Sequence, residues 1–360
     1  ITSASILFED TKKLATTIKQ LFRIPLLIGG PHVTIFPEDA MKAGLFDCGV
    51  IGEGEEVILE LIDHFKEGLP LEEINGIIYK DNERLKKTKP RAPIRELDKL
   101  PMPALDLLPS LDHYYPQAFT YKKRPVGYIL SSRGCPFSCI YCIRIMGKRF
   151  RAHTPERIIN EIERLIDEFG VKEIHFSDDC FAVDKNRVNK LCDLILKKKL
   201  KFRWKCITHV NSLTYELLKK MKLAGCWYLG VGVETGDQKM MNFIKKKLDL
   251  EHLQKVLKWA KSLGIAVKGF FILGFPTETI SSIHKTIDFS KKNPFFAVSY
   301  NIAYLNPGSE MDRMAEMYGT VKRENTNVTA YSDNMSFVPH GFTPEVLKKI
   351  QRDAYLGFYL

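Results

Sequence analysis

Three cysteines lie within eight residues, in the stretch Cys135-Pro-Phe-Ser-Cys139-Ile-Tyr-Cys142, with the spacing Cys-x3-Cys-x2-Cys. Thiols this close together are typical of metal ligands. The other five cysteines, at positions 48, 180, 192, 206 and 226, stand singly and fit small buried hydrophobic residues rather than a disulfide scaffold. We therefore expect a metal centre at the three clustered cysteines and a reducing, cytoplasmic compartment.

Three kinds of centre are compatible with this spacing. Structural zinc takes four ligands, and the sequence has neither a second Cys-x2-Cys pair nor a His-x3-5-His pair, although His153 could complete a Cys3His set. A buried or redox-active pair of thiols is the second possibility. A [4Fe-4S] cluster takes one thiolate at each corner iron, so that three thiolates leave one iron open to a substrate or cofactor. The spacing favours the cluster, and the other two interpretations stay open.

The elements that must position these cysteines alternate between strands and helices. One helix is predicted to begin at Thr154-Pro-Glu156, with an N-cap Thr followed by Pro at the first helical position. Six βα units in series predict a partial barrel with its chemistry at the carboxyl ends of the strands. The predicted strands cover residues 127–130, 173–177, 202–208, 228–233, 267–272 and 297–303.

A shorter α/β pattern precedes the barrel. Strands are predicted at residues 3–7, 26–28 and 49–51, with helices between them and a hairpin at 77–85. Three such strands are about half of a doubly wound sheet, so we expect a fragment of a longer protein. A proline-rich linker follows. The predicted domains are 1–88 (partial Rossmann-like), 89–124 (linker), 125–319 (partial barrel) and 320–360 (C-terminal loop and helix).

The Cys-x3-Cys-x2-Cys motif after the first strand of a six-unit series resembles the radical S-adenosylmethionine (SAM) superfamily. The resemblance implies a [4Fe-4S] cluster at Cys135, Cys139 and Cys142 whose open iron chelates SAM and whose electron cleaves it to a 5'-deoxyadenosyl radical. It also implies that residues near the ends of successive strands contact SAM. The alternative is that these residues cap a helix, lie at the surface as acids or form strand-to-helix turns. These residues are Tyr141, Ser177, Asp178, Glu234 and Ile272.

The N-terminal part resembles the second half of a cobalamin-binding Rossmann domain, with Ser5-Ile-Leu7 and then the paired glycines. The family's Asp-x-His-x-x-Gly segment is absent, so no axial His ligand is assigned, and the shortened domain can have lost cobalamin binding. His32 is predicted with equal weight as a cofactor contact or as a loop residue bonded to the backbone. The predicted contacts are Gly29, Gly30, His32, Gly52, Glu53 and Gly54.

The whole chain therefore resembles the cobalamin-dependent (class B) radical SAM enzymes. The fold class expected is α/β, a partial (β/α)6 TIM-like barrel preceded by a partial Rossmann-like cobalamin-binding domain. The function expected is methylation of an unactivated carbon in a small molecule, with lipids and natural products as candidates. A low-potential donor such as ferredoxin or flavodoxin is the expected electron source. The alternatives are a cobalamin-independent enzyme that modifies tRNA and a non-catalytic metal-binding or electron-carrier module.

The formal net charge of +11 raises the question of a nucleic-acid partner. The runs of lysines in the sequence, among them Lys245 to Lys247, lie far apart in helix-like patterns. They predict lysines on the solvent-exposed faces of helices. We therefore do not expect nucleic acid to bind. No apolar run is long enough to cross a membrane.

Overall fold

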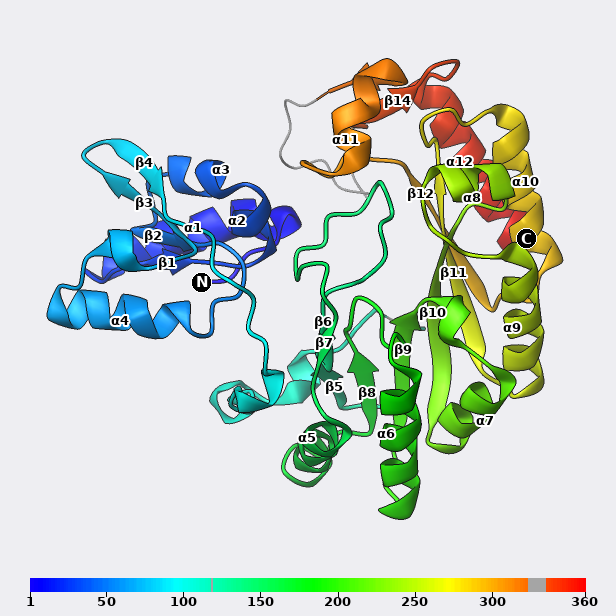
Figure 1. Cartoon of the computed structure of the whole chain (residues 1–360), viewed down its shortest axis with the longest axis horizontal. Coiled ribbons are helices and arrows are strands. Elements are labelled where there is room, and N and C mark those ends of the chain that lie inside the picture. The colour runs from blue at the N-terminus through cyan, green and yellow to red at the C-terminus, as the bar shows by residue number, and fades with distance from the viewer. Residues whose placement is uncertain (118, 323–334) are drawn as a thin grey trace. The chain divides into compact units, whose positions relative to one another are not determined.

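The computed structural model describes residues 1–117, 119–322 and 335–360. The chain divides into two compact units (Figure 1). Of the described residues, the first contains 1–95, 143–147, 322 and 335–336, and the second contains 96–117, 119–142, 148–321 and 337–360. The helix expected at the end of the chain is α12, Pro344–Tyr359, whereas the loop expected before it falls largely outside the described residues.

The N-terminal unit is built on a four-stranded sheet with the order β1-β2-β3-β4. β1 and β2 are parallel, and β3 and β4 continue the sheet as the expected antiparallel hairpin. The strands are β1 Leu27–Ile28, β2 Cys48–Val50, β3 Ile77–Asp81 and β4 Arg84–Lys87, and the helices are α1 Phe8–Leu21, α2 Pro31–Ile35, α3 Pro37–Lys42 and α4 Val57–Glu67.

The prediction of a strand at residues 3–7 is wrong. Residues Ser5–Leu7 form a 3-10 helix that leads directly into α1, and only Thr2 pairs with the sheet, through an isolated bridge to Gly29. The two apolar residues that suggested a strand, Ile6 and Leu7, are exposed. Phe8 at the start of α1 is buried instead, because it packs against the His32 ring.

The second unit contains the predicted six-stranded parallel sheet, in the order β12-β11-β10-β9-β8-β5. All six predicted strands are confirmed, with ends that differ from the prediction by at most two residues. Apolar runs of this length between amphipathic helices determine such a sheet, because each crossover helix buries one face of it. The strands are β5 Val126–Ile129, β8 Glu173–Phe176, β9 Arg203–Thr208, β10 Cys226–Glu234, β11 Ala266–Leu273 and β12 Ala297–Ile302.

Helices cover one face of this sheet (Figure 1). The predicted cap of α5 is confirmed, since the Thr154 hydroxyl accepts the N–H of Arg157. In β11, alternate residues are buried and half-buried, and Phe271 is fully buried while its neighbours Phe270 and Ile272 are half-buried. The helices are α5 Pro155–Asp167, α6 Lys185–Lys197, α7 Tyr215–Leu223, α8 Gln238–Phe243, α9 Leu250–Ser262, α10 Ile280–Lys292, α11 Glu310–Met314 and α12.

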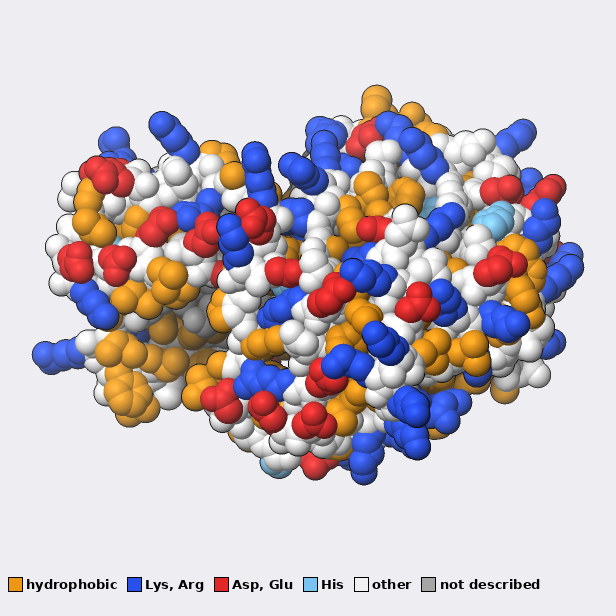
Figure 2. All heavy atoms as spheres, turned by 60° about the horizontal axis from the view of Figure 1, so that its bottom comes forward, with side chains coloured by type: hydrophobic (Ala, Val, Ile, Leu, Met, Phe, Trp, Pro, Cys, Tyr) orange, Lys and Arg blue, Asp and Glu red, His pale blue; other side chains and the backbone are white. Residues whose placement is uncertain are grey.

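The surface carries mixed charge. On the face shown in Figure 2, Lys and Arg side chains lie interspersed with Asp and Glu across most of the surface. Several exposed lysines of the barrel helices form ion pairs, such as Lys190 with Glu156 and Lys198 with Glu163. In the described part of the chain, no helix combines the length and apolar character needed to cross a bilayer.

Candidate functional site

The loop that carries the three cysteines begins at the carboxyl end of β5. Its base is closed by a short antiparallel pair, β6 Ser132–Arg133 with β7 Arg151–Ala152. All three cysteines are half-buried free thiols. The site therefore lies at the end of the sheet where parallel α/β folds place their chemistry, as predicted from the sequence.

Two distant segments hold the loop in place. The N–H of Ile140 donates to the carbonyl of Ile244, and the Ile140 carbonyl accepts the N–H of Met311. The Asn306 amide donates to the carbonyl of Tyr141 over 2.8 Å. A short loop with few internal hydrogen bonds would otherwise be mobile, so these contacts preorganise the thiols.

The arrangement of ligands disfavours a single zinc ion. Among the described residues, no three His, Cys, Asp or Glu side chains converge as they would on one metal ion. His153, the possible fourth zinc ligand, bonds through Nδ1 to Asp98 over 2.9 Å, a contact that metal-ligating histidines also make, so it is the lack of convergence that disfavours zinc. Thiolates that each bind a different iron of a cubane need not converge on one point, so the three cysteines fit a cluster.

Burial raises the pKa of the Cys135 and Cys142 thiols, to about 11 for Cys142, and the neighbouring thiols add to this. The positive charge of Lys246 acts in the opposite direction on both. A metal must therefore displace protons from these thiols when it binds, and a nearby cation assists that step.

Asp178, a predicted SAM contact at the end of β8, is buried in a hydrogen-bonded network. Its carboxylate accepts the N–H and hydroxyl of Ser131, at 2.7 and 2.6 Å, and the hydroxyl of Ser132. The guanidinium of Arg187 lies 3.5 Å from the same carboxylate. This geometry favours a positioning role for Asp178, beneath the segment that leads into the cysteine loop, over direct contact with SAM.

Glu234, at the end of β10, forms a buried ion pair that the sequence did not predict. The Lys246 ammonium lies 3.1 Å from Glu234 Oε1 and 3.5 Å from the Tyr141 hydroxyl. Only 12% of the lysine side chain and 8% of the glutamate side chain are exposed. The expectation that the run Lys245 to Lys247 is solvated is therefore wrong for its middle residue. No local pattern distinguishes Lys246 from its neighbours in the sequence.

Tyr141 connects this pair to the cysteine loop. Burial raises the pKa of its phenol well above the ordinary value, and the charges of Glu234 and Cys139 add to this, so the hydroxyl keeps its proton. Its ring contacts Phe275 at 5.4 Å between centroids, within an apolar cluster to which Ile272 also belongs. The structure thus brings Tyr141, Glu234 and Ile272 together, whereas Ser177 is exposed just after the end of β8.

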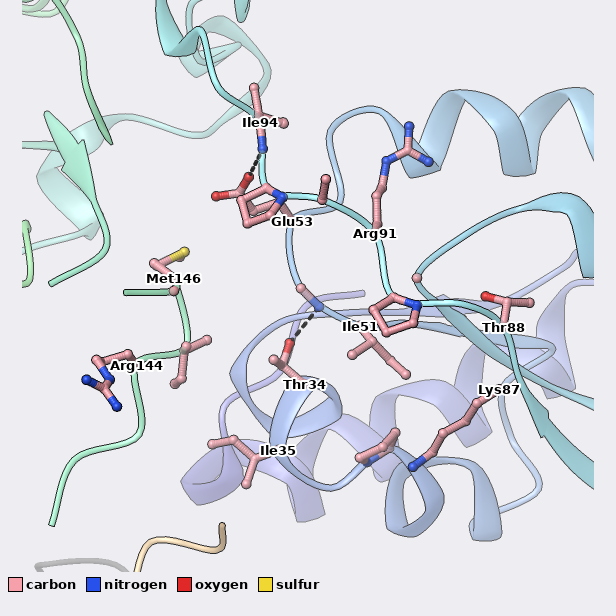
Figure 3. A pocket seen from close by; sticks show the side chains of 18 of the residues that line it. Thr34, Ile35, Ile51, Glu53, Lys87, Thr88, Arg91, Ile94, Arg144 and Met146 are labelled. Carbon is pink, nitrogen blue, oxygen red and sulfur yellow. Dashed lines mark hydrogen bonds between the residues drawn. The ribbon is translucent and has the colours of Figure 1, made fainter. Parts of the chain in front are cut away.

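The N-terminal unit contains a cavity of about 500 Å³ (Figure 3). Two of the residues predicted to bind cobalamin, Gly52 and Glu53, line it. The N–H of Gly52 donates to the Thr34 hydroxyl, and Glu53 accepts the N–H of Ile94. Gly52 has a φ of +90° with open space where a Cβ would lie, so the backbone there is accessible.

Two other predicted cobalamin contacts, Gly30 and His32, pack against other residues of the same unit. A Cβ on Gly30 would lie 2.5 Å from the Thr2 hydroxyl, so this glycine allows close packing of the chain's own N-terminal residues. His32 lies in the helix α2 and is fully buried, so its expected position in a loop is wrong, whereas its contact with a cofactor stays a prediction. Its ring is fully buried, stacks on Phe8 at 3.9 Å and bonds to Ser5. Gly29 and Gly54 do not line the cavity.

The chain is similar to proteins with the same combination of units. A family model described as the radical SAM superfamily matches residues 129–290. An uncharacterized methyltransferase of Pyrococcus horikoshii is 34% identical over 362 residues, which cover 100% of this chain and 77% of that protein. The cytidylyl-2-hydroxyethylphosphonate methyltransferase of Streptomyces wedmorensis is 28% identical over 332 residues, which cover 82% of this chain and 62% of that enzyme.

Among solved structures, the radical SAM methyltransferase TsrM from Kitasatospora setae, with cobalamin and a [4Fe-4S] cluster bound, has the same fold. It superposes with a TM-score of 0.72 at 18% identity, over 96% of this chain and 67% of that chain. This likeness confirms the expected fold class, an α/β unit followed by a partial barrel.

The fold and the site together define a class of protein: a partial (β/α)6 barrel with three closely spaced cysteines after its first strand, preceded by an α/β unit. Because a relative is 34% identical across the whole chain and the family model matches, the chain belongs to the radical SAM superfamily.

Proposed function

We propose that this protein is a cobalamin-dependent radical SAM methyltransferase that acts on a carbon of a small molecule. The observation that carries the proposal is the set of three braced, half-buried thiols at the carboxyl end of β5, beside the buried Lys246–Glu234 pair. The relatives named above are both methyltransferases, which supports methyl transfer as the reaction.

The residues of the chain have separable tasks in this proposal. Cys135, Cys139 and Cys142 hold the cluster, and the backbone contacts of Ile140 and Tyr141 fix their geometry. Glu234 and Lys246 present opposite charges at the rim, and the apolar side chains around Tyr141 exclude water from it. A [4Fe-4S] cluster held by the three cysteines would supply the electron that cleaves SAM, and cobalamin held by the N-terminal unit would supply the methyl group.

The cavity of the N-terminal unit fits part of a cobalamin molecule. Its volume of about 500 Å³ suits a nucleotide-like tail, and the exposed backbone at Gly52 allows close approach of a ligand. Thr34 supports this edge, because its hydroxyl accepts the Gly52 N–H and donates to the Gly30 carbonyl. Gly52, Glu53 and Thr34 are therefore the residues that we assign to the cofactor.

The proposal also covers the class of substrate and the electron donor. The sheet face opposite the helices carries half-exposed apolar residues, Tyr128 at 48% and Ile207 at 46% exposure, beside the half-buried Phe270. Lys205 and Lys268 lie on the same face of the sheet, so it suits a small molecule with apolar and polar parts, with lipids and natural products as the candidate classes. A low-potential donor of ferredoxin or flavodoxin type would reduce the cluster. The single free cysteines fit a reducing cytoplasm.

The proposal is tested by anaerobic reconstitution with iron and sulfide, followed by EPR spectroscopy of the reduced protein with and without SAM. We expect about four irons per chain and a spectrum that changes when SAM is added. Cys139→Ser should lose the cluster, whereas Cys192→Ser, which alters a buried thiol in α6, should keep it. A cluster whose spectrum ignores SAM would instead support the electron-carrier alternative. Cobalamin-dependent formation of S-adenosylhomocysteine would support methyl transfer.

A further inference from the structure

The loop after α8 is built to turn one lysine inward. Lys245 and Lys247 both have left-handed backbones, with φ of 54° and 52°, which non-glycine residues rarely adopt. The carbonyl of Lys246 accepts a hydrogen bond from His209 Nε2, and the carbonyl of Lys247 accepts one from the Asn211 amide. With the backbone held on both sides, Lys245 and Lys247 are exposed and Lys246 enters the interior.

The strand that receives this lysine is adapted to the same contact. Glu234 has a φ of 70°, and the pairing of β10 with β11 shifts register between Gly232 and Glu234. Gly232 is needed for the contact, because a Cβ there would lie 2.4 Å from Glu234 Oε1 and 2.9 Å from Lys246 Nζ. Backbone strain of this kind persists where the surroundings enforce it, and it is common at functional sites.

Stability alone does not account for a buried ion pair at this position. The free energy needed to remove two charges from water is about as large as the free energy gained from their attraction. Proteins in which apolar residues replace such a pair are often no less stable. The pair is, however, close enough to the cysteine loop to interact with it electrostatically. Lys246 contacts the Tyr141 hydroxyl, and its charge interacts with Cys135, Cys139 and Cys142.

We propose that Lys246 and Glu234 act in opposite directions on the reduction of a cluster held by Cys135, Cys139 and Cys142, so that their balance keeps it as easily reduced as it is. This inference rests on the cluster assigned in the proposed function, and it requires neither SAM cleavage nor methyl transfer. Reduction adds one electron from an external low-potential donor, and hence one negative charge, to the cluster. The positive charge of Lys246 stabilises the reduced form, and the negative charge of Glu234 opposes it. In a partly desolvated site both effects exceed their size in water.

The test is a redox titration of the reconstituted protein without SAM, followed by EPR. Lys246→Met should make reduction harder, so that the ratio of reduced to oxidised cluster at a fixed potential falls about tenfold, a shift of about 59 mV for one electron. Glu234→Gln should shift the ratio by a similar factor in the opposite direction. The double variant should lie close to the wild type, because the two changes offset each other. Lys247→Met removes the exposed charge of the adjacent residue and should leave the ratio unchanged.

A merely structural role would give a different result. If Lys246→Met and Glu234→Gln shift the ratio in the same direction, or by no more than Lys247→Met, the inference is wrong. Lys246→Arg keeps the charge and should keep the ratio near that of the wild type, which guards against a Met variant that misfolds. A ratio in Lys246→Arg like that of Lys246→Met would also refute the inference. A wild-type protein that loads the cluster but does not respond to SAM contradicts the proposed function while leaving this test intact; one that loads no cluster refutes both.

Discussion

The carboxylate of Asp178 accepts the N–H of Ser131 over 2.7 Å and thereby joins the end of β8 to the end of β5, four residues before Cys135. The same carboxylate accepts two hydroxyl groups and faces the Arg187 guanidinium. A buried carboxylate with this many donors anchors the segment from which the cysteine loop begins.

Asp178→Asn should destabilise the second unit and reduce its iron content. The amide would place donor hydrogens against hydroxyl and guanidinium donors, and Arg187 would lose its buried counter-charge, at a cost of about 3–5 kcal/mol. Urea unfolding and iron analysis measure the two effects. Asp193→Asn, an exposed acid paired with Lys220, is the control and should change stability by less than about 1 kcal/mol. A variant as stable as the control, with full iron content, would show that Asp178 anchors nothing.

Glu278 should make the stability of the second unit depend on pH. Burial raises the pKa of this carboxyl from 4.5 to about 7, although the N–H groups of Gly274 and Phe275 donate to it. Because the pKa is higher in the folded state, the stabilisation is fully present below about pH 4.5 and is lost as the pH rises through about 7.

Glu278→Gln carries no titrating proton, so it should be more stable than the wild type at pH 8 by about 2–3 kcal/mol and closer to it at pH 5. Thermal unfolding across this range measures the difference. Glu168→Gln, at an exposed acid next to α5, should show no such trend. Parallel pH profiles for wild type and Glu278→Gln would mean that the buried carboxyl does not titrate as described.

Gly232→Ala should weaken SAM binding without preventing folding. The added methyl group would collide with Glu234 Oε1, so Lys246 and Glu234 would separate. We expect about tenfold weaker binding, about 1.4 kcal/mol, in a SAM titration followed by EPR. Gly357→Ala, where the methyl would meet only the flexible end of Lys291, is the matched control. Unchanged affinity in Gly232→Ala would argue that the pair lies away from SAM.

Thr34→Val should weaken cobalamin binding by the N-terminal unit about fivefold, or about 1 kcal/mol, because the Gly52 backbone would no longer be held in position for the ligand. The valine keeps the shape of the side chain but cannot accept the Gly52 N–H. Absorbance titration with hydroxocobalamin measures the affinity. Thr17→Val, on the exposed side of α1, is the control. Equal affinities for the two variants would remove Thr34 and Gly52 from the assigned cofactor site.

The sequence predicted the barrel well because its signals are local. Each apolar run followed by an amphipathic helix specifies a strand, and parallel strands bring Tyr141, Glu234 and Ile272 to one end of the sheet. The prediction failed at Ile6 and Leu7, where an apolar pair is exposed at the start of a helix. A short apolar run does not reveal on its own whether it will be buried.

Other features depend on contacts that no local pattern encodes. His32 is a core residue because α1 places Phe8 against it, and Asp178 is buried because Ser131 and Arg187 surround it. Lys246 differs from Lys245 and Lys247 only in the direction that its backbone imposes, and that direction is set by His209 and Asn211. Tertiary structure determines these roles, so the sequence could not predict them.

The most direct test of the central claim is product analysis by mass spectrometry after anaerobic reconstitution, with SAM and a strong reductant. We expect 5'-deoxyadenosine from the wild type and none from Cys139→Ala. A cluster-loaded wild type that releases no 5'-deoxyadenosine, or equal amounts from the Cys139→Ala variant, would contradict SAM cleavage at these three cysteines.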